Sequence, residues 1–92
     1  MIQVEEIKKI LMEKFPQSQI SVEDLTGTSD HFQVLMVSPQ FEGRNMVEQH
    51  QLIYGALKEQ LREAIHALTL KTFTPKEWEM QKANQQNLKG IT

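Results

Sequence analysis

The chain has 92 residues, of which 24% are charged and 39% hydrophobic, and its formal net charge is -2 at pH 7. This length allows one domain with one modest core. The negative charge argues against nucleic-acid binding driven mainly by phosphate neutralisation. The absence of cysteine excludes disulfides, thiolate ligands and a cysteine nucleophile. With no signal peptide pattern and no apolar run near the roughly 20 residues of a membrane helix, we expect a cytoplasmic protein that does not bind membranes.

The first half of the chain predicts one helix and a β-hairpin. Apolar residues recur every three or four positions over residues 2–15, as on one face of a helix. Ile20 and Val22 then alternate with polar residues, which indicates a strand with one buried face. A turn over 26–30 leads to a second strand over 31–38. This strand is apolar on both faces, so we expect it in the middle of the sheet.

The second half begins with a helix-start signal. Asn45 is placed to cap the helix, and Glu48 stands three residues on, in the capping-box position. Apolar residues follow at helical spacing over 46–64. Gly55 lies inside this stretch, where it either allows close packing against a neighbour or marks a break between two shorter helices.

The last third of the chain predicts a strand and a further helix. Residues 67–73 alternate and are rich in β-branched side chains, as in strands. Thr74, Pro75 and Glu77 then form a second helix-start signal. A short helix follows, and residues 83–92 have no periodicity, so we expect a frayed tail after a domain spanning residues 1–82.

This order, α-β-β-α(α)-β-α, predicts an α+β domain in which helices cover one face of a three-stranded mixed sheet. Signals of catalysis are absent from the sequence. The serines lack the Gly-x-Ser-x-Gly context of a nucleophile elbow, and the four glycines are too scattered to form a phosphate loop. We therefore expect a protein that is not an enzyme.

Six short motifs, in order and at compact spacing, resemble the BolA family, closest to its short YrbA-like branch. They are His31-Phe32-Gln33-Val34, Val37-Ser38, Phe41-Glu42-Gly43-Arg44, Val47 to Leu57 with Tyr54, His66-Ala67-Leu68 through Lys71-Thr72, and Thr74-Pro75-Glu77-Trp78. The resemblance spans nearly the whole chain. It implies a fold similar to the class II K-homology domain.

The resemblance also implies a function in partnership with monothiol glutaredoxins. Together the two proteins hold a bridged 2Fe-2S cluster or form a cluster-free complex, in iron–sulfur trafficking and in iron and redox regulation. In such a complex, the histidine at the position of His66 is the expected ligand from the BolA-like side. A glutaredoxin cysteine and glutathione supply thiolates. Neutral imidazole is a good iron ligand, and mixed His/Cys ligation of 2Fe-2S centres is established.

The second ligand from this chain is left open by the sequence. Family members supply a His or Cys from the loop between the first two strands, and here His31, at the end of that loop, is the imidazole available. It is either a ligand or the ordinary first residue of the strand. Many family members carry Arg-His in the long helix, where this chain has Gln49-His50. We interpret His50 as a partly buried structural histidine.

Three further residues are candidates for partner or glutathione binding. Arg44 and Lys71 either bind glutathione, an acidic partner or a phosphate, or are solvated surface residues. Phe41 is either an exposed aromatic on the partner surface or part of the core. We expect Trp78 to be structural and to anchor the last helix over the sheet.

Two other functions remain open from the sequence. The first is a nucleic-acid-binding transcriptional regulator that uses the K-homology-like fold, although the chain is acidic and lacks a Gly-x-x-Gly loop. The second is a cluster-free interaction module that forms a homodimer through exposed sheet edges.

Overall fold

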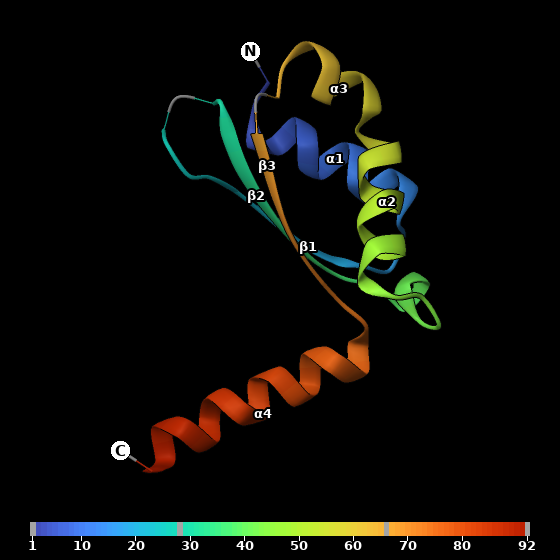
Figure 1. Ribbon diagram of the computed structural model, residues 1–92. Helices are drawn as coiled ribbons and strands as arrows, with labels where there is room; N and C mark the ends of the chain where they lie inside the picture. The colour runs from blue at the N-terminus through green and yellow to red at the C-terminus, as the bar shows by residue number, and fades with distance from the viewer. Residues whose placement is uncertain (1, 28, 66, 92) are drawn as a thin grey trace.

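The structure is a computed structural model that describes residues 2–27, 29–65 and 67–91, with side chains up to Ala83. Its elements follow the expected order (Figure 1). They are α1 (Val4–Lys14), β1 (Gln19–Asp24), β2 (His31–Val37), the short 3-10 helix η1 (Pro39–Phe41), α2 (Met46–Ala56), α3 (Lys58–Glu63), β3 (Ala67–Phe73) and α4 (Pro75–Ile91).

The three strands form one mixed sheet in the order β1-β2-β3, with β2 in the middle as predicted. β1 and β2 pair antiparallel as a hairpin, with Ser21 opposite Leu35. β2 and β3 pair in parallel, with His31 beside Ala67. A parallel pair needs a long crossover connection, which α2 and α3 provide.

Helices cover one face of the sheet, which confirms the predicted layers. On β2, the side chains of Phe32, Val34 and Met36 point to this face and are fully buried. Ile7 and Leu11 of α1, with Ile53 and Leu57 of the crossover, complete the centre of this core. The side chains of Gln33 and Leu35 alternate with the buried ones and are half-buried on the opposite face.

The long helix predicted over 46–64 is divided into α2 and α3 at Leu57. A Cβ atom added to Gly55 would meet nothing within 4 Å, so close packing does not explain this glycine. The break between two shorter helices is therefore the alternative that the structure shows.

The buried face of α2 differs from the predicted apolar stripe. Val47 and Tyr54 are 64% and 42% exposed, whereas Gln49 is 5% exposed. The inward positions are Gln49, Ile53 and Leu57, which are spaced by four residues. Apolar spacing alone does not show which helix face meets the sheet, and Val47 and Tyr54 lie on the exposed side of α2 although they are apolar.

Both predicted capping boxes are present. The Asn45 side chain accepts a 2.9 Å hydrogen bond from the Glu48 backbone N–H, and the Glu48 carboxylate accepts one of 3.0 Å from the Asn45 N–H. In the second box, the Thr74 hydroxyl accepts a 3.1 Å hydrogen bond from the Glu77 backbone N–H, and the Glu77 carboxylate accepts one of 2.8 Å from the Thr74 N–H. These bonds satisfy N–H groups that a helix start leaves without an intrahelical partner, and so they fix where α2 and α4 begin.

Helix α4 is longer than the short helix that the sequence pattern indicated. Its backbone is helical from Pro75 to Ile91 and leads away from the sheet (Figure 1). Good helix formers such as Glu, Gln, Lys and Ala fill this segment, so a helix forms without apolar periodicity. The Trp78 ring lies 5.3 Å from that of Phe73 and joins the first turn of α4 to the end of β3. Fraying beyond residue 82 stays a prediction.

Within the described part of the chain, none of the helices combines the length and apolar character needed to cross a membrane.

Candidate functional site

The candidate site lies where β2 and β3 begin. Because the two strands are parallel, both start at the same end of the sheet, and His31 pairs with Ala67. The Ala67 N–H donates a 3.0 Å hydrogen bond to the Asp30 carbonyl, which extends the pairing to the residue before β2. The start of β3 is therefore held against the start of β2.

The His31 imidazole is half-buried on the sheet face that the helices leave open. Its Nε2 atom lies 3.1 Å from the Thr69 hydroxyl oxygen on β3. In the tautomer that carries its proton on Nε2, the ring donates to Thr69, and the Nδ1 lone pair points elsewhere. Metal-binding histidines commonly have one ring nitrogen held in this way while the other binds the metal.

The loop before His31 is organised by Asp24. One oxygen of its carboxylate accepts from the backbone N–H of Gly27 at 3.0 Å, and the other accepts from that of Ser29 at 2.9 Å. Gly27 and Ser29 have positive φ angles of 74° and 61°. Such a tight turn suits glycine and requires local hydrogen bonds. Sequence reasoning did not single out Asp24, although an aspartate that begins a Gly/Ser turn is a recognised signal.

His66, the ligand predicted first, lies outside the described residues, so its role stays a prediction. It directly precedes Ala67 in the sequence. Among the residues that the structure does describe, no group of three or more His, Asp or Glu side chains could hold a metal ion. His50 is half-buried on α2, as its spacing predicted.

A buried polar network, which sequence reasoning missed, lies at the other end of the sheet. The Gln49 side-chain oxygen accepts a 2.7 Å hydrogen bond from the Thr72 hydroxyl. The Gln49 amide donates to the Arg44 carbonyl at 2.9 Å and to the Phe41 carbonyl at 3.4 Å. This one side chain therefore joins α2, β3 and the segment that carries Arg44.

The candidate binding residues lie in different environments. Arg44 and Lys71 have exposed side chains, the first between η1 and α2 and the second on β3 beside Leu35. Neither takes part in an ion pair within the described residues. Phe41 is 0% exposed, and its ring lies 6.2 Å from that of Phe15. Phe41 is thus a core residue rather than an exposed partner contact.

The open face of the sheet continues from His31 as a mixed surface. Gln33 lies beside Thr69, and Leu35 lies beside Lys71, on adjacent strands. All four are half-buried or exposed. This face offers hydrogen-bonding groups near the imidazole and, four residues further along the strands, one apolar side chain and one cation. Such a composition is typical of protein interfaces with a polar rim.

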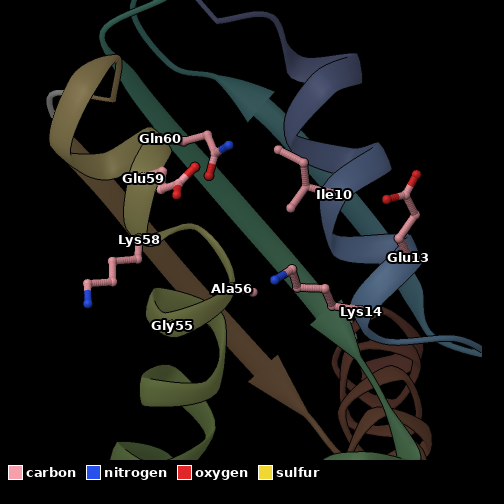
Figure 2. Close-up of a pocket in the computed structure, with 8 residues that line it drawn as sticks. All are labelled: Ile10, Glu13, Lys14, Gly55, Ala56, Lys58, Glu59 and Gln60. Atoms are coloured by element: carbon pink, nitrogen blue, oxygen red, sulfur yellow. The ribbon is translucent and has the colours of Figure 1, made fainter.

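A hollow of about 400 Å³ lies on the helical side, between the end of α1 and the junction of α2 with α3. Figure 2 shows Ile10, Lys14 and Gln60 turned toward it, whereas Glu13 and Lys58 point away. Helices cover the sheet face opposite to His31, so this hollow is separate from the imidazole.

Comparison with known proteins identifies the family. A family model for BolA-like proteins matches residues 7–77. The chain therefore belongs to the BolA-like family, as its motifs predicted.

Three relatives illustrate the family. The uncharacterized protein RP812 of Rickettsia prowazekii is 38% identical over 79% of this chain and 95% of its own length. The acid stress protein IbaG of Escherichia coli is 36% identical over 79% of this chain and 84% of its own. The DNA-binding transcriptional regulator BolA of Escherichia coli is 45% identical over 58% of this chain, but the match spans only 50% of that regulator.

Solved structures of the family share the fold. A BolA-like protein of Babesia bovis superposes with a TM-score of 0.78 at 31% identity, covering 89% of this chain and 95% of that one. The BolA domain of SufE1 from Arabidopsis thaliana superposes with a TM-score of 0.75 at 30% identity, covering 80% of this chain and 93% of that one. The mixed sheet and the helices on one face are thus family features.

Proposed function

We propose that this protein is a non-catalytic partner of a monothiol glutaredoxin. The two proteins share a bridged 2Fe-2S cluster or form a cluster-free complex, and they act in iron–sulfur trafficking and in iron and redox regulation. Membership of the BolA-like family supports this proposal. The chemistry of the residues at the start of β2 and β3 supports it independently.

The observation that carries the proposal is the His31–Thr69 contact of 3.1 Å. When the ring donates from Nε2 to this hydroxyl, the contact orients the ring and leaves Nδ1 to act as a ligand. His66, the ligand predicted first, directly precedes Ala67, which pairs with His31, so His31 is the candidate for the second imidazole donor.

The composition of the chain explains why a partner is needed. With no cysteine, the chain can offer iron no thiolate, whereas 2Fe-2S clusters are held mainly by thiolates. A glutaredoxin cysteine and glutathione supply these thiolates in the proposed complex. We assign Lys71 and Arg44 as candidate contacts for the glutathione carboxylates, since both have exposed cationic side chains.

Reconstitution tests this proposal. The protein is mixed with a monothiol glutaredoxin, glutathione, iron and sulfide, and visible absorption and circular dichroism are recorded. We expect a spectrum distinct from that of the glutaredoxin homodimer, and we expect His66→Ala to alter or abolish it. His50→Ala removes an imidazole from α2 and serves as the matched control, which should leave the spectrum unchanged.

Two results would count against cluster sharing. One is a spectrum identical to that of glutaredoxin alone, with or without this protein. The other is equal behaviour of His66→Ala, His31→Ala and His50→Ala. Binding of the glutaredoxin without any spectral change would leave the cluster-free complex as the function.

The alternative function is a nucleic-acid-binding transcriptional regulator. It is favoured by one observation, the 45% identity over 53 residues to the DNA-binding transcriptional regulator BolA of Escherichia coli. DNA affinity that falls steeply with rising salt would support this alternative, because each phosphate contact releases counterions. Affinity that is absent at moderate salt would exclude it.

A further inference from the structure

One edge of the sheet is open beside a groove of mixed polar and apolar lining. Of the strands that the structure describes, only β2 pairs with β1, so the outer side of β1 is an edge. A groove of about 270 Å³ runs between this edge and α1 and is lined by Val4, Glu5, Lys8, Ile20, Ser21 and Val22. The β1 residues Ile20 and Val22 are only half-buried.

The alternation of hydrogen-bonded and non-hydrogen-bonded pairs between β1 and β2 shows which backbone groups of β1 face the open edge. The Leu25 N–H donates to the His31 carbonyl at 2.9 Å, so this antiparallel pair is a hydrogen-bonded one. Hydrogen-bonded and non-hydrogen-bonded pairs alternate along such a ladder. Ser21 therefore bonds toward β2, whereas the N–H and C=O groups of Ile20 and Val22 point away from β2 toward the open edge.

We infer that this edge binds a second copy of the chain, with the two β1 strands antiparallel about a two-fold axis at Ser21. Ile20 then lies opposite Val22 of the partner subunit, and the two exchange backbone hydrogen bonds. Gln19 lies opposite Glu23 of the partner subunit, and the two serines face each other. The partner's Val22 and Ile20 add two apolar side chains beside Ile20 and Val22 at the groove, and the two sheets become one sheet of six strands.

Two registers that shift the axis toward the end of β1 are less favourable. An axis at Val22 would place Ile20 opposite Asp24 of the partner subunit, an apolar side chain against a carboxylate. The next register would place the two Glu23 carboxylates face to face, and like charges directly opposite are destabilising. The outer edge of β3 carries the exposed Lys71, and lysine on an edge strand discourages pairing. The axis at Ser21 pairs apolar with apolar and opposes no like charges.

Single cysteines introduced into this cysteine-free chain test the register directly. Directly opposite residues in a non-hydrogen-bonded pair have Cα atoms about 4.5 Å apart, within the range that a disulfide spans. We expect Ser21→Cys to form a covalent dimer rapidly under mild oxidation. Gln19→Cys and Glu23→Cys should each crosslink poorly with themselves, because the two copies would be about 13 Å apart along the strand. A mixture of these two variants should crosslink.

Two outcomes would overturn the inference. Equal crosslinking of all three cysteine variants would indicate random collision, and crosslinking only between Ser21→Cys and Glu23→Cys would indicate the axis at Val22. Sedimentation of the cysteine-free protein provides the second measurement. The wild type should show a concentration-dependent dimer, and Ser21→Glu should be monomeric because it opposes two carboxylates.

Gln51→Glu is the control for that variant. It adds the same charge at an exposed position on α2, away from β1, and should leave the dimer intact. A wild-type chain that stays monomeric at the highest soluble concentration would refute the inference. The proposed glutaredoxin partnership does not depend on this edge, so either can fail without the other.

Discussion

The Thr72 hydroxyl on β3 donates a 2.7 Å hydrogen bond to the Gln49 side-chain oxygen on α2, inside the core. The same Gln49 side chain donates to the Arg44 carbonyl at 2.9 Å. Strand, helix and connecting segment thus depend on one buried amide. Because its donors and acceptors are satisfied inside the core, the network fixes how the crossover packs on the sheet.

Replacing this amide is expected to destabilise the fold. We expect Gln49→Leu to lower the free energy of unfolding by about 2–4 kcal/mol, because it leaves the buried Thr72 hydroxyl without this partner and removes the donor to the Arg44 carbonyl. Urea denaturation followed by circular dichroism measures the change. Gln51→Leu makes the same replacement at an exposed site of α2 and should stay within about 0.5 kcal/mol of the wild type. Equal stability of the two variants would contradict this account of Gln49.

The aspartate at the end of β1 is expected to control the loop before His31. Asp24→Ala removes the acceptor of the Gly27 and Ser29 N–H groups. If this lowers the free energy of local opening by about 1.4 kcal/mol or more, amide hydrogen exchange in the turn should accelerate more than tenfold. Glu23→Ala is the control, since its exposed side chain lies on the same strand. Unchanged exchange at Ser29 in Asp24→Ala would show that the carboxylate does not hold the loop.

The hydroxyl of Thr69 is expected to orient the ring of His31. Thr69→Val keeps the shape of the side chain but removes the oxygen 3.1 Å from Nε2. We expect the ¹⁵N chemical shift of Nε2 to change in this variant, because this nitrogen loses its hydrogen-bond partner. Thr69→Ser should restore the wild-type shifts because it restores the hydroxyl. Identical ring shifts in wild type and Thr69→Val would mean that the contact does not orient the imidazole.

Phe41 and Arg44 lie three residues apart, yet their substitution should have different effects. Phe41→Ala should cost about 3–5 kcal/mol of stability, since it empties a fully buried site beside Phe15. Arg44→Ala removes an exposed side chain and should leave stability nearly unchanged. We expect Arg44→Ala to weaken binding of the glutathione-loaded glutaredoxin instead, as measured by calorimetry. Unchanged affinity would remove Arg44 from the proposed interface.

Much of the fold follows from local sequence signals. The capping residues Asn45 and Thr74 mark where α2 and α4 begin, and the alternation over 67–73 matches β3 residue for residue. These signals act over a few neighbouring residues and so can be read from the sequence. The length of α4 was missed because helix propensity, rather than apolar spacing, supports its second half.

The candidate site depended on information that local patterns do not contain. The parallel register that brings Ala67 beside His31, and with it the contact to Thr69, joins segments more than 30 residues apart. The inward position of Gln49 likewise depends on which helix face meets the sheet. A polar residue in line with Ile53 and Leu57 is the signal that could have revealed it.

The central claim is that an imidazole of this chain binds the shared cluster. Pulsed electron paramagnetic resonance of the reduced complex with glutaredoxin tests it most directly, with ¹⁵N-histidine incorporated into this chain only. The account predicts a strongly coupled histidine nitrogen in the wild type, retained in His50→Ala and altered or lost in His66→Ala. A cluster spectrum without any coupled ¹⁵N from this chain would contradict the claim.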